Sequence, residues 1–302
     1  MDISNNFKNF HKNFPYLNIE EKIEYFSVFG GYENLKQLSF SQSIFEDIDR
    51  YIIQRFDTLS QFFKLAEDEK EQEEIELFLK KIAFGERKIF SVFKDGKISR
   101  LKGKSIYKKL FEKNLIKKEF SREKPIIKHS KQPLKKHLRH YKIEDKIKFS
   151  KPFYRFWFTF IAPNKKAIKE EKTDILKEII TRGFDKYVSF SFEELSNELI
   201  KKIYENNRYI ETGSYWERNK EIDMLAKISK NGFIAGECKW KNQKVCKNIL
   251  NKLQKKCEGM DFEIESYALF SKSGFSKELL NSRYDKILLF DLKSFERLYD
   301  DR

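Results

Sequence analysis

Two apolar, strand-like segments joined by a tight turn constrain the fold of this chain more than any other feature. They are Glu221–Ser229 and Phe233–Trp240, and the turn-forming pair Asn231-Gly232 separates them. Successive side chains of a β-strand point to opposite faces of the sheet, so every second residue shares a face. The sequence therefore predicts two paired, largely apolar strands in which the few charged residues occupy defined faces.

Helix and strand patterns alternate around this strand pair. Phe192–Asn206 predicts an amphipathic helix with Leu195, Leu199 and Ile203 on its inner face. The other predicted helices are Ile168–Arg182, which is expected to end at Gly183, Val245–Cys257 and Phe275–Arg283; the other predicted strands are Tyr209–Trp216, Ile264–Phe270 and Ile287–Asp291. This order is typical of an α/β core, which we expect to span residues 165–302.

The first half of the chain predicts two further units. Residues 1–74 are expected to be helical, with an apolar stripe that ends at the turn signal Gly30-Gly31. Residues 75–164 are expected to form a basic winged helix-turn-helix. Its predicted helices are Ile75–Ala83, Arg87–Phe93 and Lys104–Asn114, and its wing strands are Leu115–Phe120 and Tyr141–Phe149, joined by the basic loop Ser121–His140. The aromatic segment Pro152–Ala162 is predicted to be a buried hinge. The fold class is thus α+β or α/β.

The positive charge of the chain is concentrated in one segment. The net charge is +15, and residues 87–155 hold 24 Lys and Arg against 6 Asp and Glu. A localised basic surface is typical of proteins that bind a phosphate backbone, so DNA is the expected partner. In Lys104–Asn114, Ile106, Leu110 and Phe111 are expected to face inward. The lysines expected to contact nucleic acid are Lys104, Lys108, Lys109, Lys113, Lys117 and Lys118.

Several classes of protein are disfavoured by the composition. No apolar run approaches the ~20 residues that span a bilayer, and the first residues lack the apolar segment of a signal peptide. Three cysteines without CxxC spacing indicate reduced thiols and a cytoplasmic location. Gly103-Lys104-Ser105 looks like the end of a phosphate-binding loop, but Ile98 stands where the first glycine is required. The sequence therefore predicts no ATP binding of that kind.

Three charged residues within the paired strands point to chemistry. Glu237 and Lys239 share one face of their strand, and Asp223 lies on the preceding strand near the facing position. Two carboxylates in apolar surroundings are costly unless they pair or bind a cation, and hard oxygen ligands suit Mg²⁺ or Mn²⁺. Such an ion polarises a phosphodiester, and Lys239 can orient the attacking water or offset charge on the phosphate. The alternative is an ordinary strand pair with an exposed salt bridge.

Asp223 followed by Glu237-Cys238-Lys239 resembles the signature of PD-(D/E)XK nucleases. The resemblance implies a restriction-endonuclease-like core and a further Glu from the preceding helix, which is Glu193, with Glu194 as the fallback. It also implies that Asp223, Glu237 and Glu193 hold the metal.

The chain also resembles the region that follows the ATP-binding module in archaeal-type and bacterial DEXX-box ATPases, including their C-terminal domain of unknown function. The residues that carry this resemblance are Tyr25–Gly31, Leu79–Gly85, Tyr141–Ile143 with Asp145, Pro152–Phe158, Trp216, Glu221–Asp223, Gly236–Trp240 and Ser271–Phe275. The resemblance implies that residues 1–74 are a remnant of the ATPase lid. The P-loop module itself is absent from the sequence, so no ATPase activity is expected.

Three functions are compatible with these features. The first is a Mg²⁺-dependent endodeoxyribonuclease, which the intact Asp223, Glu237 and Lys239 favour. The second is a non-catalytic DNA-binding or regulatory protein with a vestigial nuclease fold. The third is an interaction subunit, which the missing ATPase module favours and which implies a protein partner or a homo-oligomer.

Overall fold

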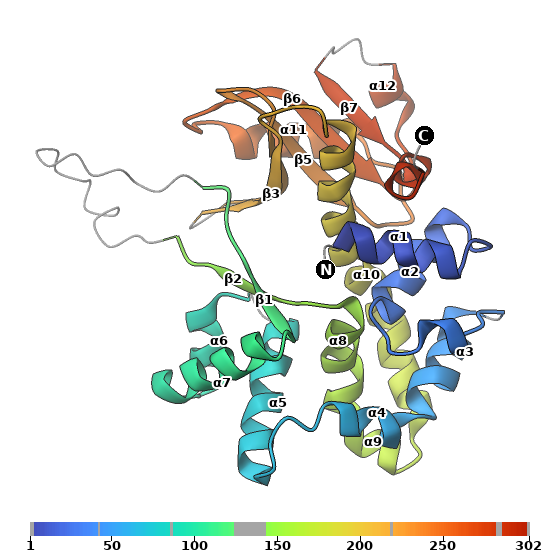
Figure 1. Cartoon of the computed structure of the whole chain (residues 1–302). Coiled ribbons are helices and arrows are strands. Elements are labelled where there is room, and N and C mark those ends of the chain that lie inside the picture. Colours follow the sequence, from blue (N-terminus) through green and yellow to red (C-terminus); the bar gives the residue numbers. More distant parts are fainter. Residues whose placement is uncertain are drawn as a thin grey trace, which may run out of the picture.

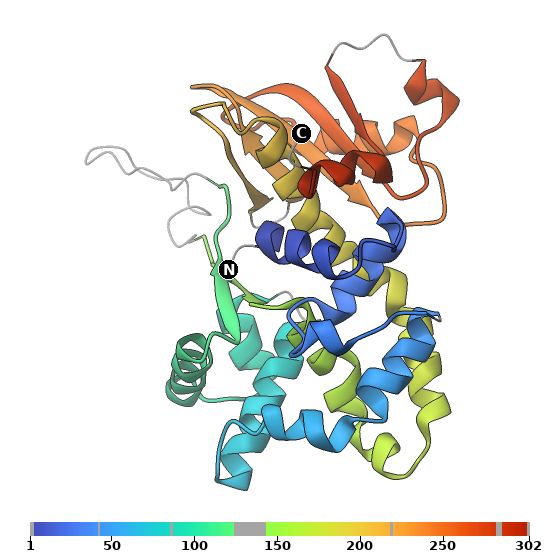
Figure 2. The same cartoon turned by 45° about the vertical axis from the view of Figure 1, so that its right-hand side comes forward.

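The protein has a mixed α+β fold in which one mixed β-sheet packs against a larger helical region (Figure 1). The computed structural model describes residues 3–41, 43–84, 87–123, 143–217, 220–281 and 286–300. Figures 1 and 2 show the sheet at one end of the molecule, with the N-terminal helices packed beneath it. Within the described residues, no helix combines the length and the apolar character that a bilayer span requires.

The first half of the chain is helical, as predicted. Its helices are α1 (Ile3–Asn13), α2 (Ile19–Phe29), α3 (Ile44–Ile48), α4 (Phe56–Phe62), α5 (Glu69–Phe84), α6 (Ile89–Asp95) and α7 (Arg100–Glu112). A capping box at Asn18 begins α2. The Asn18 side chain accepts from the Glu21 N–H, and the Glu21 carboxylate accepts from the Asn18 N–H. The helix ends at Gly30, and Gly31 has a φ of +81°, a conformation that favours glycine. The predicted end of this helix is confirmed.

The aromatic segment predicted as a hinge is a packed part of the core. It forms α8 (Pro152–Phe156) and a continuing helical segment, Trp157–Ile161, which packs against α5 and α10. The Trp157 ring stacks on Phe63 with centroids 4.8 Å apart. The segment is buried, as predicted, but its dense aromatic contacts fix it in place rather than making it a hinge.

Helix α10 (Thr173–Ile203) is one continuous helix of 31 residues, preceded by α9 (Lys165–Lys169). The predicted break at Gly183 is wrong. A Cβ at Gly183 would lie 3.0 Å from the Phe160 ring, so glycine permits the close packing of helix and ring there. Glycine costs a helix only about 1 kcal/mol, and the buried residues on both sides of this position outweigh that cost.

The five-stranded sheet has the strand order β3-β4-β5-β6-β7. Its strands are β3 (Glu211–Trp216), β4 (Glu221–Lys227), β5 (Gly232–Lys239), β6 (Glu263–Ser271) and β7 (Ile287–Phe290). The pairs from β3 to β5 are antiparallel and those from β5 to β7 are parallel. Helix α11 (Lys247–Cys257) covers one face and α10 covers the other, while α12 (Lys277–Leu280) precedes β7. The predicted strands over 165–302 are confirmed, and so is their order with the helices that follow them, whereas the two helices predicted before them are the single helix α10.

A separate two-stranded sheet lies between the helices and the large sheet. It pairs β1 (Ile116–Glu119) antiparallel with β2 (Lys146–Phe149), close to the predicted wing strands. The chain leaving β1 is fastened to the edge of the large sheet, because the Arg122 N–H donates to the Ser214 carbonyl and the Ser121 hydroxyl donates to the Trp216 carbonyl. Most of the predicted basic loop lies outside the described residues, at positions 124–142.

Helix α7 differs from its prediction at one apolar position. Ile106 and Leu110 are buried as expected, but Phe111 is 49% exposed. Adjacent helical residues lie about 100° apart around the axis, so the face that buries Leu110 turns Phe111 outward. Gly103 lies inside this helix, where a Cβ would be 2.6 Å from the Phe93 ring, so its role is the close packing of α6 on α7.

Candidate functional site

The charged residues predicted from the paired strands lie on β4 and β5. Glu237 and Lys239 share the α11 side of β5, and the Lys239 ammonium donates to Glu237 Oε1 at 2.7 Å. Cys238 faces the opposite side and is buried in the core that α10 forms. Asp223 is joined to β5, because its Oδ2 accepts from the Cys238 N–H at 2.9 Å. The predicted sharing of faces is confirmed.

A β-bulge places Asp223. Gly213 of β3 faces Leu225, whereas Tyr215 faces Ile222, so Asp223 and its neighbour lie opposite a single residue of β3. As a result, Ile222 and Leu225 both enter the core beneath α11, although three positions separate them. Bulges re-aim side chains and are frequent beside functional sites. The alternation of the sequence gave no sign of this bulge.

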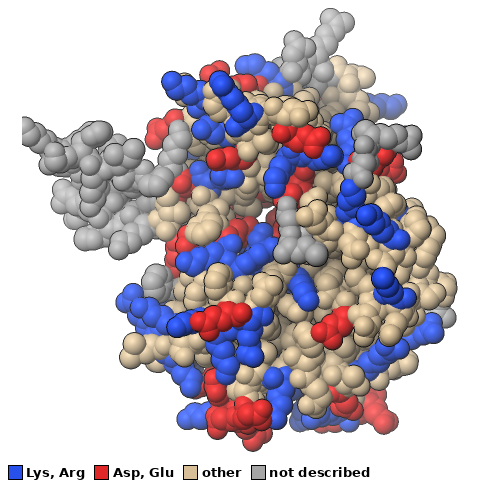
Figure 3. Space-filling view, in the orientation of Figure 1, with Lys and Arg blue, Asp and Glu red and all other residues tan. Residues whose placement is uncertain are grey.

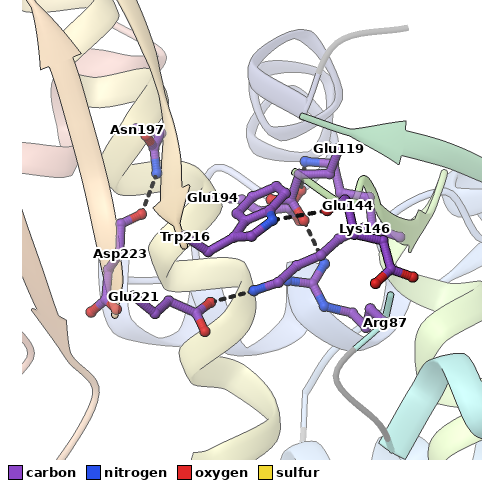
Figure 4. A network of polar contacts seen from close by, with 10 residues as sticks. Arg87, Glu119, Glu144, Lys146, Glu194, Asn197, Trp216, Glu221 and Asp223 are labelled. Atoms are coloured by element: carbon purple, nitrogen blue, oxygen red, sulfur yellow. Dashed lines mark hydrogen bonds and ion pairs between the residues drawn. The ribbon is translucent and has the colours of Figure 1, made fainter. Parts of the chain in front are cut away.

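The side-chain amide of Asn197 links Glu193 of α10 to the strands, and the sequence analysis missed this residue. Asn197, one turn after Glu193, donates from Nδ2 to the Glu193 carbonyl at 3.0 Å and to the Asp223 carbonyl at 3.2 Å. Figure 4 shows this amide between the helix and the strand backbone. The spacing of four residues, which places Asn197 on the same helical face as Glu193, was the available signal.

Burial and neighbouring charges shift the pKa values of all three carboxyl groups. Burial, then the charge of Asp223, raises the pKa of Glu193 to about 8. Burial, then the charge of Glu237, raises the pKa of Asp223 to about 6. Burial alone would also raise the pKa of Glu237, but hydrogen bonds from Lys239 and Lys256 outweigh it and lower that pKa. Buried carboxyl groups whose pKa values a neighbouring carboxylate raises, such as Glu193 and Asp223, are typical of functional sites.

Lys256 is the second residue that the sequence analysis missed. It lies in the last turn of α11, and its ammonium donates to Glu237 Oε2 at 2.8 Å. Both carboxylate oxygens of Glu237 therefore accept from a lysine, one on its own strand and one on the neighbouring helix.

The donor set suits a hard divalent cation. Glu193, Asp223 and Glu237 offer carboxylate oxygens, and their crowding is the repulsion that a bound cation relieves. In the part of the chain that the structure describes, no three acidic, histidine or cysteine side chains already stand around one point as a metal cluster. Binding would therefore require these side chains to draw together.

A cleft of about 350 Å³ lies between the two-stranded sheet and α10. Arg87, Lys117 and Lys118 line one wall, and Glu193 and Asn197 line the other. Figure 3 shows basic and acidic side chains intermixed on the face that it draws, in the orientation of Figure 1. The cleft exposes the Glu193 side of the candidate site to solvent.

Ion pairs hold the two walls of this cleft together. Lys148 of β2 pairs with Glu194 at 2.5 Å. Lys146 pairs with Glu221 at 2.6 Å, and both residues are labelled in Figure 4. Burial would raise the pKa of Glu194, but Lys148 outweighs it and lowers that pKa. Glu194, the fallback for Glu193, is therefore engaged in a partly buried ion pair that fastens β2 to α10.

The lysines predicted to contact nucleic acid do not all face solvent. Lys109 was expected to contact nucleic acid, but its ammonium lies 2.7 Å from Glu71 of α5. Lys108 is exposed and lies near Glu112, and Lys104 and Lys113 are exposed. Lys117 and Lys118 lie on β1 and line the cleft instead. Nucleic-acid binding by these residues stays a prediction.

Comparison with known proteins places the site within a region of recognised similarity. Residues 157–255 match DUF234, a family described as archaea bacterial proteins of unknown function. The chain is also 33% identical over 195 residues to an uncharacterized protein of Methanocaldococcus jannaschii. The matched region covers 61% of this chain and 40% of that relative. The chain thus spans less than half the length of this curated relative. No solved structure matches. Glu193, Asp223, Glu237 and Lys239 all fall in the DUF234 match.

Proposed function

We propose that this protein is a metal-dependent nuclease that hydrolyses DNA phosphodiester bonds, with a PD-(D/E)XK-like core and a winged-helix DNA-binding region. One observation carries the proposal: Asp223 is hydrogen-bonded to the strand that carries Glu237 and Lys239, and the charge of Asp223 acts on the buried Glu193 of α10. Four charged groups in largely apolar surroundings are costly for folding, so their convergence is more readily explained by function than by stability.

Each residue of the site has a distinct role in this proposal. Asp223, Glu237 and Glu193 would hold Mg²⁺ or Mn²⁺, which would supply Lewis-acid activation of the phosphodiester and of water. Lys239 orients the attacking water or offsets the charge that builds on the phosphate. Asn197 fixes the separation of α10 and β4 and so holds Glu193 in place relative to Asp223.

The DNA-binding part of the proposal is supported by the order and charge of the elements. Three helices, α5 to α7, precede the two-stranded sheet, which is the order that a winged helix-turn-helix requires. Helix α7 places exposed lysines opposite its buried Ile106 and Leu110. Its ion pairs to the acidic start of α5 reduce the number of lysines that remain for phosphates.

The proposed activity is tested by cleavage of plasmid and oligonucleotide DNA. We expect cutting in Mg²⁺ or Mn²⁺, loss of cutting in EDTA, and recovery when the ion is restored. DNA binding without cutting under all these conditions would overturn the assignment and leave a non-catalytic DNA-binding protein.

The contribution of α7 is tested by replacing its exposed lysines. The triple variant Lys104→Gln, Lys108→Gln, Lys113→Gln is expected to weaken binding to duplex DNA about tenfold or more. The affinity should also depend less on salt concentration, because each lost phosphate contact means that fewer counterions leave the DNA on binding. The matched control is Lys166→Gln, Lys169→Gln, Lys172→Gln, which removes the same charge from exposed positions around α9. Equal affinity of both triple variants, measured by fluorescence anisotropy at several salt concentrations, would show that α7 does not bind DNA.

A further inference from the structure

Each carboxylate oxygen of Glu237 already accepts from a lysine ammonium. Lys239 holds Oε1 at 2.7 Å and Lys256 holds Oε2 at 2.8 Å, and the Glu237 side chain is only 12% exposed. A divalent ion that coordinates Glu237 comes close to both ammonium groups, and the repulsion between like charges opposes its binding while both lysines stay in place.

Lys256 can leave Glu237 more readily than Lys239 can. Lys239 lies on the same strand as Glu237, two positions away, and its side chain is 24% exposed. Lys256 approaches from the last turn of α11, and its side chain is 35% exposed. Among the described residues, Glu237 is the one carboxylate within ion-pair distance of Lys256. Its long stem can swing into solvent while the helix stays packed through Leu250, Leu253 and Cys257.

We infer that Lys256 is a built-in counter-ion of Glu237, which a divalent cation displaces when it binds. The inference rests on the proposed metal site and adds a competitor to it. In the absence of metal, the ammonium offsets the charge of Glu237 and keeps the clustered carboxylates compatible with folding. When a metal binds, the freed ammonium lies beside the site, where a substrate phosphate is the available anion.

Competition and simple bracing predict opposite effects of removing Lys256. If Lys256 competes with the metal, Lys256→Met tightens metal binding, because the ion no longer has to break the contact with Glu237. If Lys256 braces Glu237 in a geometry that the metal requires, the same variant weakens binding. Methionine keeps the apolar stem and removes only the ammonium, so the packing of α11 is retained.

The test is Mn²⁺ binding to the full chain without DNA, followed by the electron paramagnetic resonance signal of free Mn²⁺. Lys255→Met is the matched control, because Lys255 is exposed on the same turn and its loss changes the net charge equally. Relative to that control, Lys256→Met is expected to lower the Mn²⁺ dissociation constant about two- to fivefold, the range of a partly exposed ion pair. Asp223→Asn is expected to release the ion and so locates it at the site.

The outcomes separate this inference from the proposed function. Binding that Asp223→Asn abolishes, but that is equal or weaker in Lys256→Met than in Lys255→Met, overturns the inference and leaves the metal site standing. Mn²⁺ that remains free with the wild type and with Lys256→Met overturns the metal-dependent function and the inference with it. Thermal unfolding of each variant shows whether the fold is retained.

Discussion

Asp223→Asn is expected to reduce DNA cleavage by about 10³-fold or more, because removal of a central group of a catalytic unit costs that much or more. The charge of Asp223 raises the pKa of Glu193, and the charge of Glu237 raises the pKa of Asp223. The amide oxygen of asparagine can still accept the Cys238 N–H, so the bond that joins β4 to β5 is retained. The loss is therefore expected in the chemistry and not in the fold.

Cleavage rates, DNA affinity and melting temperature are measured together for this variant. Asp261→Asn, at an exposed position after α11, is the control for loss of one carboxylate. Because the pKa of Asp223 is raised by burial and by Glu237, its neutral replacement should fold at least as stably as the wild type. Cleavage that survives in Asp223→Asn would remove Asp223 from the catalytic site.

Glu193→Gln is expected to stabilise the protein at alkaline pH by about 5 kcal/mol and to have little effect at acidic pH. The pKa of Glu193 is raised to about 8 in the folded protein, above the ordinary value of 4.5 that applies when the chain is unfolded. Below pH 4.5 the group is neutral in both states and costs nothing. Between pH 4.5 and 8 the unfolded chain ionises first, so the wild type loses stability as pH rises, and above pH 8 the loss is complete.

The measurement is urea unfolding of wild type and Glu193→Gln between pH 4 and 9. Glu263→Gln, at the exposed start of β6, removes a carboxylate that is not buried and serves as the control. A difference between Glu193→Gln and wild type that stays constant over this pH range would contradict a raised pKa at this position. The same variant should lose cleavage activity, so stability and activity are expected to change in opposite directions.

Local pattern was enough to predict the strands and the faces of their charged residues. Apolar segments bounded by turn residues gave β4 and β5, and the period of two placed Glu237 and Lys239 together. The periodicity of 3.6 gave α7 and the C-terminal part of α10, since both have a buried apolar stripe.

The contacts that could not be predicted from the sequence join residues that are far apart along the chain. Lys256 reaches Glu237 from 19 residues away, and Lys109 reaches Glu71 from 38 residues away. A helical pattern identifies a polar face, but it does not say whether solvent or another element lies opposite that face. The continuity of the helix at Gly183 was unpredictable for the same reason. The close packing of Gly183 against Phe160 is a tertiary contact, and it outweighs the local tendency of glycine to end a helix.

The continuity of α10 determines how this protein can be divided for experiments. Its first half buries Leu176, Ile180 and Phe184 in the helical core, and the Tyr187 hydroxyl donates to the carbonyls of Ser27 and Pro152. Its second half carries Glu193 and covers the large sheet. A recombinant fragment that starts at residue 165 would keep every strand of that sheet but leave half of its longest helix without a core. The expression unit for biochemistry and crystallisation is therefore the whole chain.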